Sequence, residues 1–343
     1  MSLSVETLGF RGKGLCRPEC VLAHSSGALL VPDWTGSGGV SVIRPDGGTA
    51  RLLSNRTGEP IRPNGIALEA GGSVLLAHLG AEMGGLFRLW PDGGCEPFLT
   101  EIDGRVLPPS NFVLADGQGR LWLTVSTRQI PRDRAYRADV ADGFIVLMDA
   151  SGARIVADGL GFANECALSE DGATLYVNET FARRTLAFDV DFQGRLGGKR
   201  IVARYGRGTF PDGLALDDLG GLWITSIISN RLIRVDPEKN ASDNQEIMIE
   251  DADPDHIAWV EAAYQSHEIG RPHLDTVAGR VLRNISNCAF GGPDLGHVHM
   301  GSLAGDAIAG FESQYTGVEP SHWDADISGI LSRAVDVDPE DRA

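Results

Sequence analysis

The chain has 343 residues, more than most single compact domains, although closed all-β architectures often reach this length as one unit. Hydrophobic residues make up 42% and charged residues 22%, a composition that excludes global disorder and supplies enough apolar material for a large core. Thirty basic and 47 acidic side chains give a net charge of −17, and such a negative field excludes nucleic acid and anionic membranes as expected partners. The expected partner is a neutral small molecule or a cation.

Glycine is unusually frequent, with 44 residues. The glycines do not follow the three-residue period of collagen, so they indicate many tight turns and therefore short strands. Residues 1–15 contain no apolar core of signal-peptide length, and the sequence has no run of about 18 apolar residues. We therefore expect a cytoplasmic protein.

The five cysteines, Cys16, Cys20, Cys95, Cys166 and Cys288, are odd in number and form no Cys-x-x-Cys pair. This spacing does not predict a disulfide framework. We expect buried free thiols, and the alternative is that Cys16 and Cys20 bind a soft metal together.

One phrase recurs six times along the chain: a polar residue after Pro, Ala or Ser, a short apolar stretch, an Asp/Gly-rich turn, and an alternating apolar strand. Examples are RPECVLAHSSGALLVPDW from Arg17, PSNFVLADGQGRLWLTVST from Pro109 and FPDGLALDDLGGLWITSI from Phe210. The polar residues, called blade markers below, are Glu19, Asn64, Asn111, Asn164, Asp212 and Asn287. They are 45, 47, 53, 48 and 75 residues apart, and the first four intervals match the ~40–50 residues of a four-stranded propeller blade.

Each copy of the phrase predicts a β-hairpin, and further strand-like segments fill the intervals. These segments run from Gly39 to Ile43, Gly85 to Trp90, Gly143 to Met148, Arg184 to Phe188 and Arg231 to Val235. The predicted fold is all-β, a single six-bladed β-propeller over residues 1–323. The segment from Ser4 to Phe10 is expected to close the ring beside Ala307 to Glu312, and residues 324–343 form an acidic C-terminal tail.

The last interval is about thirty residues longer than the others. From Asp255 to Gln265 the apolar positions approximate helical spacing, which predicts a short helical insertion near 255–265 in the fifth or sixth blade. The insertion, residues 251–284, either covers one end of the channel as a lid or decorates the surface.

The innermost strands of a propeller line its axis, so the six blade markers are predicted to converge there. Two carboxylates and four amides in a narrow channel favour a bound cation, because buried charges must be paired or coordinate a metal. Carboxylate and amide oxygens are hard ligands that suit Ca²⁺, Mg²⁺ or Mn²⁺ and also accept Zn²⁺. The alternative is that Asn and Asp begin these strands only as turn formers. Six aligned polar markers favour one divalent metal ion.

The motifs Arg17-Pro18-Glu19 and Pro211-Asp212-Gly213, and the segment from Asn287 to Leu295, resemble the SMP-30/gluconolactonase/regucalcin family of six-bladed propellers. The resemblance covers nearly the whole chain. It implies that the metal is held by Glu19, Asn111, Asn164 and Asp212, and that Asp212 is the general base. Asn64 and Asn287 then lie outside the ligand set or line the channel.

The chain departs from that family near the third and fourth markers. Some sugar-lactone hydrolases of the family have an Arg two residues before the third-blade Asn and a Glu on the strand pair beyond it, where this chain has Pro109 and Gln129. Glu165 stands where the family usually has Gly, and it either adds a carboxylate near the pocket or points into the blade. The candidate substrate-binding residues are Asn64, His78, Trp34, Glu165, Gln129 and Asn287. For His78 and Trp34 the alternative is ordinary packing at a strand end.

By this resemblance we expect a divalent-metal-dependent lactonase that opens a small sugar-derived or similar lactone with an activated water. The alternatives are a phosphotriester or aryl-ester hydrolase on the same scaffold, and a non-catalytic propeller that binds proteins. No Gly-x-Ser-x-Gly elbow, phosphate-binding loop or dinucleotide fingerprint occurs in a usable context, which disfavours serine-hydrolase and nucleotide chemistry. His297 and His299 alternate on one strand and either bind a metal or pack.

Overall fold

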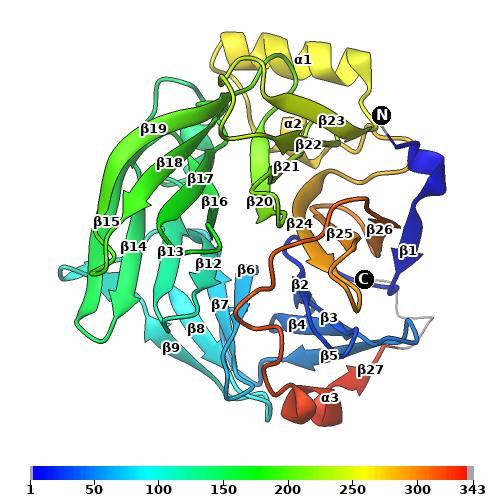
Figure 1. Cartoon of the computed structure of the whole chain (residues 1–343). Coiled ribbons are helices and arrows are strands. Elements are labelled where there is room, and N and C mark those ends of the chain that lie inside the picture. Colours follow the sequence, from blue (N-terminus) through cyan, green and yellow to red (C-terminus); the bar gives the residue numbers. More distant parts are fainter. Residues whose placement is uncertain (1–2, 338–343) are drawn as a thin grey trace.

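Six β-sheets form a ring around a central axis in the computed structural model, which describes residues 3–337 (Figure 1). The innermost strands of the six sheets surround the centre of the ring, and each sheet runs outward from there. The all-β, six-bladed propeller predicted from the repeat is confirmed.

The blades follow one another in chain order. Blade 1 contains β2 (Leu22–Ala23), β3 (Leu29–Asp33), β4 (Gly39–Ile43) and β5 (Thr49–Leu53). Blade 2 contains β6 (Pro63–Leu68), β7 (Val74–His78), β8 (Leu86–Leu89) and β9 (Cys95–Leu99), and a small hairpin of β10 (Glu101–Ile102) and β11 (Arg105–Val106) follows it. Blade 3 contains β12 (Ser110–Ala115), β13 (Leu121–Val125), β14 (Gly143–Asp149) and β15 (Gly152–Leu160).

The second half of the ring has the same order of strands. Blade 4 contains β16 (Ala163–Leu168), β17 (Thr174–Glu179), β18 (Arg184–Val190) and β19 (Leu196–Arg204). Blade 5 contains β20 (Pro211–Leu216), β21 (Leu222–Ser226), β22 (Arg231–Val235) and β23 (Gln245–Glu250). Blade 6 contains β24 (Ile285–Gly291), β25 (His297–Ser302), β26 (Ile308–Glu312) and, from the other end of the chain, β1 (Gly9–Arg11).

The hydrophobic core lies between neighbouring blades. Every residue of β3, β4, β7 and β21 is buried, because the middle strands of a blade are covered on both faces by the blades beside them. Trp122 and Trp223 are among the largest fully buried side chains. This packing on both faces explains why the strands read as continuous apolar runs in the sequence.

The N-terminal chain closes the ring. β1 pairs antiparallel with β26, with Phe10 opposite Ala309, so the outermost strand of blade 6 comes from the start of the chain. The predicted closure is confirmed, although the strand begins later than expected. Val5–Thr7 forms a short 3-10 helix (η1), with the Ser4 hydroxyl accepting a hydrogen bond from the Glu6 amide.

The C-terminal chain adds a second connection across the ring. After β26 it crosses the centre of the face seen in Figure 1 and forms α3 (Ser328–Arg333) and β27 (Val335–Asp336). β27 pairs with β5 as a fifth strand of blade 1, and Ile330 is buried in the core cluster formed by blades 1 to 4. The predicted tail thus contributes a helix and a strand up to residue 337, and residues 338–343 lie outside the described part.

The predicted helical insertion is confirmed as α1 (Pro254–Gln265), which is followed by α2 (Arg271–Asp275). Asp253 caps α1 by accepting a hydrogen bond from the His256 amide, and Pro254 occupies the first turn. Val260 is fully buried in a cluster with Tyr136, which follows the short 3-10 helix η2 (Arg132–Ala135). The insertion and the β13–β14 connection therefore pack together at the end of the ring where the innermost strands begin. No helix within residues 3–337 is long and apolar enough to span a membrane.

Buried aspartates hold the Asp/Gly-rich turns of the repeat in place. Asp217 follows β20, and its Oδ1 accepts hydrogen bonds from the Leu219 and Gly221 amides at 3.1 and 2.7 Å. Its Oδ2 accepts from Trp223 Nε1 at 2.9 Å and Arg234 Nε at 2.6 Å, which joins the turn to β21 and β22.

We predict that Asp217→Ala destabilises the propeller by about 2–4 kcal/mol, because the buried Trp223 indole and the Arg234 guanidinium both lose their acceptor. Urea denaturation measures the change. The matched control Asp218→Ala alters the next, exposed residue and should stay within about 0.5 kcal/mol of the wild type. Equal stabilities for the two variants would contradict the role assigned to Asp217.

Candidate active site

The blade markers lie where the innermost strands begin, and all six are buried, with 2% to 8% of each residue exposed. Four of them form a continuous chain of hydrogen bonds around the axis. Asn64 Nδ2 donates to Asn111 Oδ1 at 3.3 Å, and Asn111 Nδ2 donates to Asn164 Oδ1 at 2.5 Å. Asn164 Nδ2 in turn donates to Asp212 Oδ1. Residues 148 positions apart in the sequence are thus joined by side-chain contacts.

A break in strand register accompanies each marker from blade 2 to blade 6. In blade 4 the pairing shifts between Ala163 and Cys166, on either side of Asn164, and in blade 5 it shifts between Pro211 and Leu214, on either side of Asp212. Such bulges re-aim a side chain that regular pleating would place elsewhere. The local irregularity therefore turns the marker side chains toward the axis.

Glu19 reaches the site beside an arginine. Its Oε2 forms an ion pair with Arg17 Nη2 at 3.0 Å, although it accepts no hydrogen bond. Arg17 has a φ of +58°, a conformation that costs a non-glycine residue roughly 1 kcal/mol or more and is common at functional sites. Its guanidinium lies 4.4 Å from the centre of the Trp34 ring, and Trp34 Nε1 donates to the Pro63 carbonyl at 2.7 Å. Trp34 thus forms a wall beside Arg17.

A second arginine enters from the β13–β14 connection. Arg132 Nη2 donates to Asn111 Oδ1 at 3.0 Å and to Ser126 Oγ at 2.9 Å. Its guanidinium also lies 4.9 Å from the centre of the Phe162 ring. Burial lowers the pKa of Arg132. This contact makes Asn111 a double acceptor, because its oxygen already accepts from Asn64.

Two carboxylates share this buried site. The pKa of Asp212 is raised well above its usual value, first by burial and then by the charge of Glu19, while Arg132, Arg17 and the Asn164 hydrogen bond act in the opposite direction. A divalent cation would relieve this repulsion, and Glu19 Oε2, which accepts no hydrogen bond, offers it a ligand. No group of three or more His, Cys, Asp or Glu side chains within residues 3–337 could hold a metal, so a cation here needs amide oxygens as well. The oxygen donors present fit a hard cation.

Glu165 and Asn287 form a second polar layer across the channel. Asn287 Nδ2 donates to both carboxylate oxygens of Glu165 at 2.9 Å, and the Leu214 amide donates to Glu165 Oε2 at 3.0 Å. Asn287 Oδ1 accepts from the Val21 amide at 2.9 Å. Burial raises the pKa of Glu165 well above its usual value. Glu165 thus connects blades 4, 5 and 6 rather than contacting the chain of markers directly.

All five cysteines are free thiols, and Cys20, Cys166 and Cys288 are buried, whereas Cys16 and Cys95 are partly exposed. Cys20, Cys166 and Cys288 lie close enough to Glu165 for its charge to raise their pKa values, although burial is the larger cause. The three buried thiols therefore surround the second polar layer.

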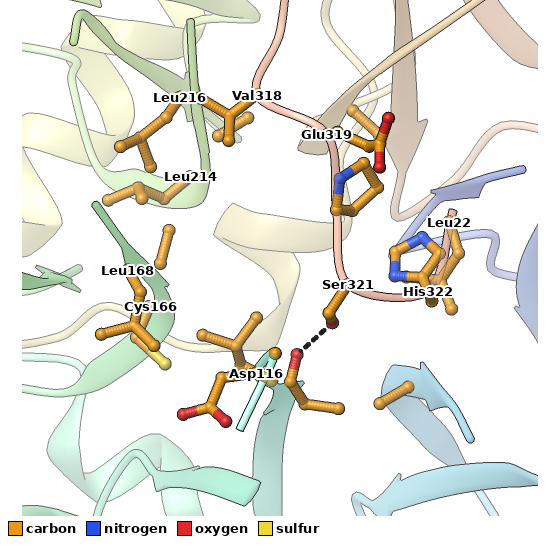
Figure 2. A pocket seen from close by; sticks show the side chains of 18 of the residues that line it. Leu22, Asp116, Cys166, Leu168, Leu214, Leu216, Val318, Glu319, Ser321 and His322 are labelled. Carbon is orange, nitrogen blue, oxygen red and sulfur yellow. Dashed lines mark hydrogen bonds between the residues drawn. The ribbon is translucent and has the colours of Figure 1, made fainter. Parts of the chain in front are cut away.

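Beyond this layer the channel widens into a cavity of about 470 Å³ with a mainly apolar lining. Figure 2 shows Leu168 and Leu214 across the cavity from the segment that carries Val318 and Ser321. The Ser321 hydroxyl donates to the Ala115 carbonyl at 2.6 Å, which fastens that segment over the opening (Figure 2). The cavity and the chain of markers occupy opposite ends of one channel.

Two other candidate residues make their contacts within their own blades. His78 Nδ1 accepts from the Arg62 amide at 3.0 Å, and its ring packs edge-on against Phe87. Gln129 Nε2 donates to Asp142 Oδ2 at 2.9 Å. No hydrogen bond joins either side chain to a blade marker within the described residues.

Sequence reasoning missed the arginines of the site. Arg17 stands inside the first copy of the repeated phrase, where it precedes the marker Glu19 by two residues. Arg132 has no local motif, but the third interval of 53 residues is longer than its neighbours and contains the connection that carries it. The length of this interval was the sequence signal that could have pointed to the connection and to Arg132.

These features define a six-bladed propeller with an oxygen-rich polar site at its axis. Residues 18–251 match the family described as the SMP-30/Gluconolactonase/LRE-like region. Because this match covers more than half of the sequence, the chain belongs to that family, and the resemblance found in the sequence is confirmed.

Several known proteins are similar to this chain. Regucalcin of Xenopus laevis is 26% identical over 222 residues, which are 64% of this chain and 70% of the relative. Pentonolactonase XacC of Haloferax volcanii is 23% identical over 198 residues, 57% of this chain and 54% of the relative. Among solved structures, a gluconolactonase from Xanthomonas campestris has a TM-score of 0.63 at 20% identity, covering 88% of this chain and 87% of that one. A calcium-binding regucalcin from Agrobacterium tumefaciens has a TM-score of 0.59 at 15% identity, covering 92% and 98%.

The similarities to solved structures show the fold of this chain. The family match relates the chain to a family that is named after a lactonase. The chain is therefore similar to proteins that act on small-molecule lactones.

We predict that His78 contributes to the pH dependence of stability. Burial, followed by the charges of Arg56 and Arg62, lowers its pKa from 6.5 to about 4. Because the folded-state pKa is depressed, this contribution is present above pH 6.5 and is lost as the pH falls toward about 4. His78→Asn keeps an acceptor for the Arg62 amide, so its unfolding free energy should fall less than that of the wild type over this range. Urea titrations at several pH values test this, and identical pH profiles would contradict it.

Proposed function

We propose that the chain is a divalent-metal-dependent lactonase, with the metal held by Glu19, Asn111, Asn164 and Asp212. The observation that carries the proposal is the meeting of two buried carboxylates, Glu19 and Asp212, beside a chain of hydrogen-bonded amide side chains. Membership of the SMP-30/Gluconolactonase/LRE-like family and the similarity to a pentonolactonase support a small lactone as substrate. The native metal would be Ca²⁺, Mg²⁺, Mn²⁺ or Zn²⁺, since each accepts oxygen ligands.

A divalent cation bound to these oxygens would polarise the lactone carbonyl and offset the negative charge that develops on its oxygen. Asp212 would accept a proton from the attacking water, and the Asn164 amide would hold the carboxylate in position through its contact with Oδ1. The hydroxyl of that water forms a bond to the acyl carbon while the ring C–O bond breaks. The proton then passes from Asp212 to the former ring oxygen, which gives the open-chain hydroxy acid.

We predict that removing the metal abolishes lactone hydrolysis. A chelated sample should fall to the spontaneous rate in a pH-stat assay and recover when a divalent ion is added back. Glu19→Gln should weaken metal binding in isothermal titration calorimetry by at least about tenfold, since even groups that only orient metal ligands contribute that much. The control Glu82→Gln changes an exposed carboxylate and should bind metal like the wild type. Full hydrolysis by metal-free protein would refute the metal-dependent mechanism.

We predict that Asp212→Asn lowers kcat by about 10²–10⁴-fold at saturating metal, because amide oxygen is a poor proton acceptor. Calorimetry on the same sample establishes that the metal is bound. A variant that binds metal and keeps full turnover would remove Asp212 from the role of general base.

A further inference from the structure

Two guanidinium groups of the candidate active site have N–H groups without an acceptor. The Nε atoms of Arg17 and Arg132 are buried and have no hydrogen-bond partner. Leaving a buried donor unpaired costs roughly 1–3 kcal/mol, and more when the group is charged. The site therefore offers two unsatisfied N–H donors, and such donors favour an anion.

Arg132 differs from other arginines of the propeller because its contacts are all neutral. Its guanidinium meets an amide oxygen, a hydroxyl and the face of Phe162, and it forms no ion pair with a carboxylate of residues 3–337. By contrast, Arg183 lies 2.6 Å from Glu261, and Arg234 lies 2.6 Å from Asp217. Arg132 thus lacks a direct ion pair in the described residues, although Glu19 and Asp212 lie near enough to interact with its charge.

A third arginine reaches the same region from the helical insertion. Arg271, at the start of α2, forms an ion pair with Asp275 and lies close enough to Tyr136 and Glu19 for these groups to raise its pKa. Tyr136 is itself buried and stacks on Phe181, with ring centres 4.8 Å apart. The insertion and the β13–β14 connection therefore bring positive charge to the mouth of the site, although the chain as a whole carries a net charge of −17.

We propose that Arg132, with Arg17 and Arg271 beside it, forms an anion subsite, and that the substrate is a lactone bearing a free carboxylate group. The lactone part of this inference rests on the proposed function. Glu19 and Asp212 would balance the charge of a divalent cation, which leaves the charge of Arg132 for the substrate, together with that of Arg17, whose ion-pair partner Glu19 would then bind the cation. Arg271 keeps its ion pair with Asp275. A guanidinium suits a planar carboxylate. A phosphate dianion would be repelled more strongly by the two carboxylates of the site, so a carboxylate is favoured.

The experiment compares two substrates that share one ring and differ in charge: the γ-lactone with a γ-carboxylate, and the same γ-lactone with a γ-carboxamide. The metal-loaded full chain should prefer the carboxylate in kcat/KM by about 10–100-fold. Arg132→Gln should remove this preference by raising KM for the carboxylate substrate, while the carboxamide changes less than about threefold. Arg132→Lys should restore part of the preference. Circular dichroism establishes that each variant is folded.

Arg134→Gln is the matched control, because it removes the same charge from an exposed residue of the same short helix η2. It should retain the wild-type preference. An equal loss on both substrates in Arg132→Gln would mean that Arg132 only positions Asn111, and would overturn the subsite. A wild type that prefers the carboxamide would overturn it as well.

If the metal-loaded wild type hydrolyses neither lactone, the proposed lactonase fails and binding tests the subsite separately. The probe is 2-hydroxyglutarate, the open-chain product of the carboxylate lactone, measured by isothermal titration calorimetry. Binding at least about tenfold weaker in Arg132→Gln than in Arg134→Gln supports the subsite, and equal binding overturns it. Tighter binding of inorganic phosphate than of 2-hydroxyglutarate would overturn the carboxylate class.

Discussion

The seam between blade 6 and blade 1 is the constraint on which the candidate site depends. Pairing of β1 with β26 closes the ring, and the Ser302 amide donates to the Pro18 carbonyl at 2.9 Å beside it. The Ser286 hydroxyl donates to the Glu19 carbonyl, also at 2.9 Å. These contacts fix the first marker against the last blade. Because Glu19 is the only marker from the N-terminal blade, an open ring would separate its carboxylate from Asp212.

Ring closure also concentrates charge in a way that the net charge of the chain does not reveal. The surface is acidic, yet the channel mouth holds Arg17, Arg132 and Arg271 near two carboxylates. In a buried site, Coulomb interactions are stronger than at the surface, so these few groups dominate the local field. Two carboxylates and two arginine N–H groups without acceptors in one site suit two ligands of opposite charge, a cation and an anionic substrate.

The repeat in the sequence was sufficient to predict the ring, the inner strands and the insertion. The polar markers were recognisable because each begins the same phrase, and the buried Asp217 explains why an Asp/Gly turn follows. β27 was not predictable, because a two-residue strand has no periodic signal and forms only by pairing with β5. Arg132 was equally hidden, since its place in the site depends on how the β13–β14 connection folds over Asn111. Tertiary contacts of this kind leave no local pattern in the sequence.

The residues that follow the markers of blades 2, 4 and 5 show how the channel is divided. A Cβ at Gly65 would lie 2.7 Å from Phe112 Cα, and one at Gly213 would lie 2.4 Å from Asn287 Cα, so the backbones of neighbouring inner strands approach too closely for a side chain there. Blade 4 instead carries Glu165, which reaches across to Asn287 and the Leu214 amide. In blade 4 this polar crosslink takes the place of the close backbone approach seen at Gly65 and Gly213. The crosslink separates the charged mouth of the channel from the apolar cavity. The two halves of the channel therefore differ in polarity.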